Sequence, residues 1–196
     1  MATLICFFAI LISFPSEQFR QIDQSAYNLL GENAFVDSLS ILGEPWVILL
    51  ASILLILYLW LHQQNYRGML FVFFAVGVGN ALNQGLKRLF DRERPNLPHG
   101  LDSYSFPSNH AMVGLLYLFT IAYFLTERLE SKMGKWLVWL AAAGLALGVG
   151  TSRIAGGEHY FSDVLAGWCA GYSLFVAVAV WYEMRERFFK KHMQNN

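Results

Sequence analysis

Five long apolar runs constrain the fold of this chain more than any other feature. Each is close to the length of about 20 residues that a helix needs to cross the hydrocarbon core of a bilayer. They cover residues 46–62, 68–86, 110–126, 134–152 and 162–184. Inside the hydrocarbon core each segment must make its own backbone hydrogen bonds, so the runs predict helices. We therefore expect an all-α, polytopic membrane protein.

A sixth apolar run opens the chain, "MATLICFFAILISF". Its fourteen residues would also suit the core of a signal peptide. The run lacks a basic n-region and an Ala-x-Ala cleavage site, which favours a retained first span. The prediction is then six transmembrane helices forming one domain over residues 1–196.

The segment between the first two spans, residues 15–44, has an amphipathic pattern. Its apolar residues recur at helical spacing: Phe19, Ile22, Ala26, Leu29 and Leu30, then Val36, Leu39 and Leu42 after a break. Two short helices lying in the membrane interface fit this pattern. A structured loop packed on the helix bundle fits it equally well.

Composition agrees with a membrane protein and narrows its partners. The chain is 56% hydrophobic and 14% charged, whereas soluble domains carry about 25% charged residues. No basic stripe interleaved with aromatic residues is present, so a nucleic-acid partner is not expected. Membrane lipids are the expected surroundings. Cys6 and Cys169 both lie in apolar runs and are interpreted as free thiols.

The distribution of basic residues predicts the orientation of the spans. One side of the membrane would carry Arg67, Arg128, Lys132, Lys135, Arg185, Arg187, Lys190 and Lys191. The other would carry Arg20, Lys87, Arg88, Arg92, Arg94 and Arg153. On this second side, all the basic residues but Arg20 cluster in two loops, where a catalytic site can require them. Both termini are therefore predicted to be cytoplasmic, in a multi-pass protein of the cell membrane.

Three polar segments fall at span ends on the predicted outer face. They are "KRLFDRERP" (87–95), "SFPSNHAM" (105–112) and "TSRIAGGEHYFSDVLAG" (151–167). Because the parity of the spans places all three on one face, we expect them to meet in an extracytoplasmic site.

Two histidines in these segments are candidates for catalysis. His159 and Asp163 are four residues apart, so on a helix the carboxylate can fix one ring nitrogen and leave the other basic. His159 is then a candidate nucleophile, although a structural His–Asp pair at a helix end is about equally compatible. In the second segment, Pro107 suits a first helical turn and Ser108 suits an N-cap, which creates an anion site. His110 could there protonate a leaving oxygen. An ordinary capped helix with an interfacial histidine is the alternative.

Cations from separate segments complete a predicted phosphate pocket. Lys87, Arg94 and Arg153 are expected to bind phosphate oxygens, whereas Arg88 and Arg92 are interpreted as solvated charges or lipid anchors. The acidic residues Asp91, Glu93 and Glu158 would balance the excess charge.

These cations supply the charge that Mg²⁺ supplies elsewhere, so no metal or other cofactor is expected. A metal site made of His110, His159 and Asp163 is ranked low because the cations would repel a divalent ion. A serine hydrolase built on Ser108 would leave the cations unexplained.

In these three segments the sequence resembles the type 2 phosphatidic acid phosphatases. Their signature is Lys-x6-Arg-Pro, Pro-Ser-Gly-His and Ser-Arg-x5-His-x3-Asp. All three parts occur in order and with the same spacing, in Lys87, Arg94-Pro95, Pro107, Ser108, His110, Ser152, Arg153, His159 and Asp163. Asn109 stands where the pattern has glycine.

The resemblance implies a role for each residue of the signature. It makes His159 the nucleophile, Asp163 its orienting partner and His110 the general acid. The phosphate ligands it implies are Lys87, Arg94, Ser108, Asn109 through its backbone N–H, and Arg153.

The expected function is hydrolysis of a lipid phosphate through a phosphohistidine. Undecaprenyl pyrophosphate and phosphatidylglycerol phosphate are the favoured substrates, and diacylglycerol pyrophosphate and phosphatidic acid stay open. The alternatives are a phosphotransferase that uses the same intermediate and a non-catalytic protein that binds or transports lipid phosphates.

Overall fold

The computed structural model describes residues 1–31, 33–95 and 103–194, with side chains described as far as residue 185. Every regular element in these ranges is helical, which confirms the all-α fold class. The predicted cytoplasmic charges of Arg187, Lys190 and Lys191 lie outside the described side chains. The elements are α1 (Ala2–Ser13), α2 (Glu17–Leu30), α3 (Ala34–Ser38), η1 (Leu39–Gly43), α4 (Pro45–Leu61), α5 (Tyr66–Val72), η2 (Phe73–Val78), α6 (Gly79–Phe90), α7 (Asn109–Arg128), α8 (Lys132–Ala155) and α9 (Phe161–Gln194).

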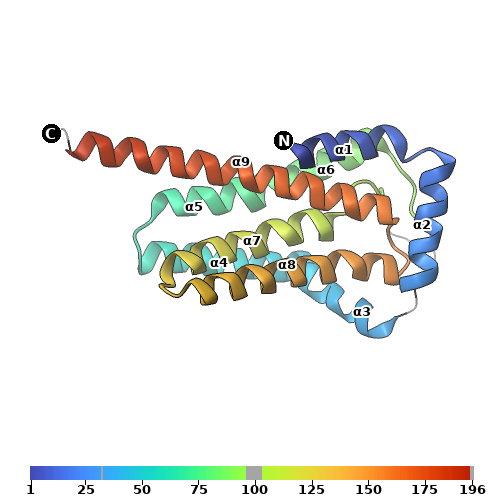
Figure 1. The fold of residues 1–196 in the computed structure, drawn as a ribbon, viewed down its shortest axis with the longest axis horizontal. Helices are drawn as coiled ribbons and strands as arrows, with labels where there is room; N and C mark the ends of the chain where they lie inside the picture. Colours follow the sequence, from blue (N-terminus) through green and yellow to red (C-terminus); the bar gives the residue numbers. More distant parts are fainter. Residues whose placement is uncertain (32, 96–102, 195–196) are drawn as a thin grey trace.

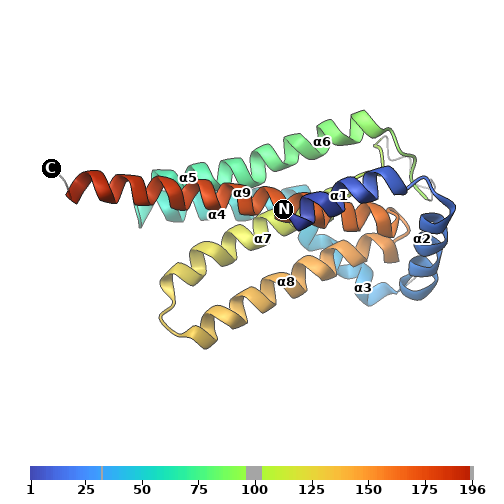
Figure 2. The same ribbon diagram turned by 45° about the horizontal axis from the view of Figure 1, so that its top comes forward.

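Four helices are long and apolar enough to cross a membrane, and the number rises to six if each of two bent helix pairs counts as one span. The four are Tyr66–Phe90, which joins α5, η2 and α6, together with α7, α8 and Phe161–Arg185 of α9. The bent pairs are α1 with α2 and α3–η1 with α4. Figure 2 shows α1 lying beside α9, against which it packs. The multi-pass membrane architecture expected from the sequence is confirmed, although α1 alone has only 12 residues.

The amphipathic segment folds into helices that cover one end of the bundle. The chain bends by 105° between α1 and α2, and α2 stands across the ends of the other helices in Figure 1. Phe19, Ala26 and Leu30 pack inward, while Ile22 and Leu29 are 45% and 82% exposed. Both interpretations of this segment were therefore partly right, because it forms helices and they pack on the bundle.

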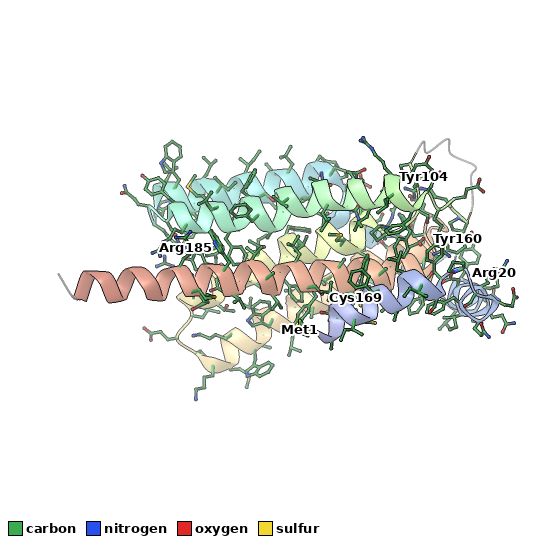
Figure 3. The ribbon with its side chains drawn as sticks, turned by 90° about the horizontal axis from the view of Figure 1, so that it is seen from above. Met1, Arg20, Tyr104, Tyr160, Cys169 and Arg185 are labelled. Atoms are coloured by element: carbon green, nitrogen blue, oxygen red, sulfur yellow. The ribbon has the colours of Figure 1, made fainter. Side chains whose placement is uncertain are left out.

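Close contact between α7 and α9 brings two of the motif segments together. A Cβ atom added to Gly167 would lie 2.8 Å from the carbonyl oxygen of Ser108, and one added to Gly171 would lie 2.7 Å from that of Met112. Small residues at this spacing let two membrane helices approach through their backbones. The start of α7 is thereby held against the start of α9. In Figure 3 the labelled residues Tyr104, Tyr160 and Arg20 lie at this end of the molecule, and Arg185 lies towards the other.

Candidate active site

The first motif segment leaves α6 through a left-handed residue. Asp91 has a φ of 52°, a conformation that aspartate tolerates better than most residues. Lys87, in the last turn of α6, is buried and donates a hydrogen bond to the carbonyl oxygen of Tyr104. After the turn at Asp91, Arg92 contacts the start of α9 and Arg94 contacts the loop that precedes it. One short segment therefore contributes three cations to the same end of the bundle.

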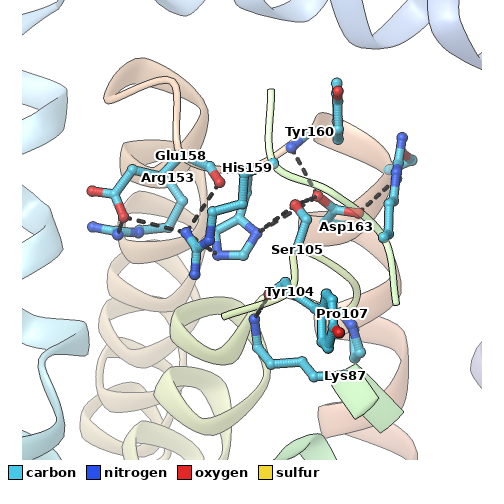
Figure 4. Close-up of polar contacts among 12 residues, drawn as sticks. Lys87, Tyr104, Ser105, Pro107, Arg153, Glu158, His159, Tyr160 and Asp163 are labelled. Atoms are coloured by element: carbon cyan, nitrogen blue, oxygen red, sulfur yellow. Dashed lines mark hydrogen bonds and ion pairs between the residues drawn. The ribbon is translucent and has the colours of Figure 1, made fainter. Parts of the chain in front are cut away.

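His159 lies buried at the centre of this cluster (Figure 4). Its Nε2 atom is 3.4 Å from Nη1 of Arg94, and its Nδ1 atom is 3.2 Å from Oγ of Ser105. Burial lowers the pKa of the His159 imidazole to about 4, and the neighbouring Asp163 opposes this effect. The ring is therefore neutral at physiological pH, with one nitrogen directed at an arginine.

The link between His159 and Asp163 differs from the predicted helical pair. The helix α9 begins at Phe161, so His159 precedes it. Nδ1 of His159 is 3.6 Å from Oδ2 of Asp163, which is longer than a hydrogen bond. The hydroxyl of Ser105 bridges the gap, because it donates to Oδ2 of Asp163 and can accept from Nδ1–H. Asp163 also accepts from the backbone N–H of Tyr160 at 2.9 Å, which caps the start of α9.

Arg94 and Arg153 share one carboxylate, that of Glu158. Oε2 of Glu158 accepts from Nη2 of Arg153 and lies 3.5 Å from Nη1 of Arg94. The backbone carbonyl of Glu158 also accepts from Arg94 at 3.2 Å. Glu158 thus balances the excess charge as predicted. Its carboxylate occupies the position in which an anionic ligand would contact both guanidinium groups.

The start of α7 contributes polar atoms that lack partners. Ser108 is the N-cap residue, but its side chain makes no capping hydrogen bond, and Pro107 precedes the helix instead of lying in its first turn. Among the described residues, the buried atoms without a hydrogen-bond partner include Ser108 Oγ, Asn109 Oδ1, His110 Nε2 and Arg153 Nε. Buried polar atoms usually have partners. Of these, Ser108 Oγ and Arg153 Nε can donate to an anion, and with the free N–H groups of the first turn of α7 they form a cradle suited to one.

His110 contacts a residue that sequence reasoning did not consider. Its Nε2 atom lies 3.5 Å from Oε1 of Glu44, at the N-terminus of α4. A Cβ atom on Gly43 would lie only 2.3 Å from Cδ2 of His110, so η1 packs directly on the ring. The charges of Arg153, Arg94 and Lys87 also act on the ring of His110, and they oppose a positive charge there. The carboxylate of Glu44 favours a protonated ring. The predicted acid and the predicted cations therefore lie at one site.

Arg92 is the clearest correction to the sequence analysis. It was interpreted as a solvated charge or lipid anchor, but its side chain is only 11% exposed. Nη1 donates to Oδ1 of Asp163 at 2.6 Å, and Nη2 donates to Oδ2 of Asp23 at 3.0 Å. Asp23 itself had a signal in the sequence, because a charged residue there interrupts the apolar face of an amphipathic helix. Ser105 and Glu44 had no comparable signal.

Within the described ranges, no three His, Cys, Asp or Glu side chains come together in a group that could hold a metal ion.

Comparisons with known proteins agree with the motif pattern. Residues 68–187 match the PAP2 superfamily. Over 135 residues, 66% of this chain, the sequence is 36% identical to the Bacillus subtilis (strain 168) protein named phosphatidylglycerophosphatase B. That match spans 65% of the relative, slightly less than two thirds of its length.

Two solved structures have a similar fold. The crystal structure described as the first transmembrane PAP2 type phosphatidylglycerolphosphate phosphatase from Bacillus subtilis has a TM-score of 0.84 and 24% identity, covering 93% of this chain and 95% of that one. Aquifex aeolicus LpxE has a TM-score of 0.57 and 23% identity, covering 80% of this chain and 93% of that one. At these identities the likeness concerns the fold alone.

Proposed function

Because the chain belongs to the PAP2 superfamily, we propose that it is an integral membrane lipid phosphatase that works through a phosphohistidine. The observation that carries this proposal is the position of His159. A neutral, buried imidazole directs Nε2 towards Arg94, beside a group of buried polar atoms without partners. A nucleophile and an anion cradle in contact are what phosphoryl transfer requires.

The first step forms a bond from Nε2 of His159 to phosphorus and breaks the bond from phosphorus to the leaving oxygen. Arg94, Arg153 and Lys87 stabilise the charge of the transferring group, together with the amides at the start of α7. His110 gives its proton to the leaving oxygen. For phosphate to bind, the carboxylate of Glu158 has to leave the two arginines.

The second step returns the enzyme to its starting state. Water attacks phosphorus while the now neutral His110 accepts a proton from it, and the bond from Nε2 to phosphorus breaks. Inorganic phosphate leaves, and His110 is again protonated. Asp163, through Ser105, holds the His159 ring in orientation and stabilises its positive charge in the intermediate.

An apolar groove supports a lipid as the leaving group. A cavity of about 390 Å³ lies between α4 and the span formed by α5, η2 and α6, with Val113 of α7 in its wall. Pro45 lines this groove, and the adjacent Glu44 contacts His110. A tail in the groove would therefore place its attached oxygen near the proposed acid.

The substrate favoured by the named relative is phosphatidylglycerol phosphate. Undecaprenyl pyrophosphate is the second candidate. The basic loop residues outside the site lie mostly on the opposite side of the membrane, which supports an extracytoplasmic active site. Both termini are then proposed to be cytoplasmic. The charge in the site comes from protein cations, so the proposed reaction requires no divalent ion.

The test uses the purified full-length chain in detergent with EDTA. It is supplied with phosphatidylglycerol phosphate or undecaprenyl pyrophosphate, and release of inorganic phosphate is measured. We expect turnover of at least one lipid by the wild type, an acid-labile phosphoryl label on the protein, and loss of both in His159→Asn. The matched control is His62→Asn, which changes an exposed histidine at the end of α4. Turnover by His159→Asn, transfer of the label to a lipid acceptor instead of water, or no activity on any lipid phosphate would each overturn the proposal.

A further inference from the structure

A buried carboxylate lies on the helix α2, which covers one end of the bundle. Asp23 is the one buried residue of α2. It accepts hydrogen bonds from the backbone N–H and the hydroxyl of Ser162, both at 2.8 Å, and from Nη2 of Arg92 at 3.0 Å. Ser162 is next to Asp163, so Asp23 fixes α2 against the part of α9 that carries the proposed orienting residue.

Arg92 joins the two carboxylates and is held on several sides. Its Nη1 atom donates to Asp163 at 2.6 Å and to the hydroxyl of Ser162 at 2.8 Å. Its guanidinium carbon lies 4.0 Å from the ring centroid of Tyr160 and 4.7 Å from that of Phe14. A planar guanidinium is suited to bridging two carboxylates between aromatic rings. Arg92 is therefore not assigned as a phosphate ligand, because the two carboxylates that it contacts would repel a phosphate.

The charges in this network have a consequence for catalysis. Two carboxylates and one guanidinium leave one net negative charge beside His159. The imidazole becomes positively charged when Nε2 bonds to phosphorus, so that net charge stabilises the intermediate. We propose that Arg92 and Asp23 are positioning residues that together set the charge which Asp163 presents to His159. This inference rests on the proposed role of His159 as nucleophile.

Charged groups from several elements lie around His159, and two of them, Arg92 and Asp23, act on it through Asp163. Lys87 comes from α6, and Arg92 and Arg94 come from the segment that follows it. Arg153 and Glu158 come from the end of α8 and the loop beyond it, Asp163 from α9, His110 from α7 and Asp23 from α2. The proposed variants change only Arg92 and Asp23, which pair with each other and, through Arg92, with Asp163.

The two charge-removing variants are expected to act in opposite directions on the acid limb of the kcat/KM profile. Asp23→Asn removes a negative charge, disfavours protonated His159 and shifts the limb to lower pH. Arg92→Gln removes a positive charge, favours protonated His159 and shifts the limb to higher pH. Each shift is expected to be about half a pH unit or more. In both variants kcat is expected to fall, because Asp163 loses a group that holds it in place. Asp23 and Arg92 line a cavity of about 630 Å³ together with His159, so KM is measured alongside kcat.

The experiment measures phosphate release by the full-length chain in detergent across pH, with the unfolding midpoint recorded for each variant. Arg92→Lys keeps the charge and is expected to keep the limb near its wild-type position while lowering kcat. Glu17→Gln is the matched control, because it removes a 66% exposed carboxylate from the same helix and is expected to leave the profile unchanged. If Arg92→Gln does not accumulate in membranes, Asp23→Asn and Arg92→Lys carry the test.

If the contacts of Asp23 and Arg92 only stabilise the fold, a different result is expected. In that case Asp23→Asn and Arg92→Gln reduce the amount of active protein and leave the acid limb where it was, or move it in the same direction. Either outcome overturns the inference while the proposed function stands. A wild-type protein inert towards every lipid phosphate would instead overturn the proposed function.

Discussion

The backbone N–H of Ser108 donates a hydrogen bond to the carbonyl oxygen of Asp163 across 3.1 Å. This bond joins the start of α7 to the start of α9, so the anion cradle and the carboxylate that orients His159 are linked through main-chain atoms. The distance between the cradle and the nucleophile therefore depends on how closely these two helices pack.

Gly171→Ala is expected to destabilise the protein and reduce its activity. The new methyl group would lie 2.7 Å from the carbonyl oxygen of Met112, so α7 and α9 must separate. A loss of about 1–3 kcal/mol is typical of such overpacking. Thermal unfolding in detergent measures it. Gly144→Ala in α8 is the control, because nothing lies within 4 Å of its new Cβ and alanine favours a helix. Equal midpoints for the two variants would contradict the proposed close packing.

Ser105→Ala is expected to lower kcat with little change in KM. The hydroxyl bridges His159 and Asp163, whose direct separation is 3.6 Å, so its loss leaves the imidazole poorly oriented. We expect a loss of about 10- to 100-fold, the size of the effect when a hydrogen-bonded partner of a metal-binding histidine is removed. Steady-state kinetics measure it, and Ser173→Ala, whose hydroxyl bonds to Thr3, is the control. Wild-type kcat in Ser105→Ala would show that the bridge has no role.

The acid limb of the kcat/KM profile is expected well below pH 6.5. Burial lowers the pKa of His159 to about 4, so the nucleophile stays unprotonated until the pH approaches that value. Between pH 6.5 and about 4, the unfolded imidazole takes up a proton that the folded one does not, so stability also falls on acidification. Phosphate release from about pH 3.5 to 8 measures the limb, with the titration of the substrate recorded separately. A limb assigned to His159 at pH 6.5 or above would contradict this assignment.

Glu158→Gln is expected to lower KM. The Glu158 carboxylate contacts both Arg94 and Arg153, so it competes with the phosphate of the substrate. A partly exposed ion pair contributes up to about 1 kcal/mol, which corresponds to a decrease in KM of up to about fivefold. Kinetics with a soluble phosphate ester measure the change, and the exposed Glu93→Gln is the control. An increased KM would mean that Glu158 assists binding.

Ser52→Phe is expected to weaken the use of long-chain substrates selectively. Ser52 lines the apolar groove beside α4, so a phenyl ring there would fill space proposed for the lipid tail. KM should rise for a long-chain lipid phosphate and stay constant for a short-chain ester. Leu54→Phe is the matched control, because Leu54 lies on the same helix, is 58% exposed and does not line the groove. Equal effects on both chain lengths would place the tail elsewhere.

The sequence was sufficient to predict the parts of this protein that depend on regular spacing. The apolar runs predicted the helices, and the motif spacing predicted that Lys87, Arg94, Arg153 and His159 meet at one end of the bundle. Their catalytic roles stay predictions. The pattern was less informative where the chain leaves a helix. His159 and Asp163 were expected on one helical face, but α9 begins only at Phe161.

The residues missed by sequence reasoning act through contacts between distant segments. In the sequence Arg92 is one loop cation among several, and nothing local indicates that it lies between two carboxylates. Its partner Asp23 is 69 positions away, on a helix whose docking depends on the 105° bend after α1. Ser105 depends in the same way on the approach of α7 to α9. Such contacts follow from tertiary packing, which short-range periodicity does not specify.

The groove beside α4 determines which substrate concentration controls the rate of this protein. Several of its lining residues, including Leu49, Ile53 and Phe73, are also exposed on the surface of the bundle. In a membrane, an apolar surface of this kind would face the acyl chains. A substrate using the groove would reach His110 by lateral diffusion and would not have to pass through water. The rate would then follow the mole fraction of substrate in the membrane. Added inert phospholipid would slow turnover by surface dilution even at constant bulk concentration.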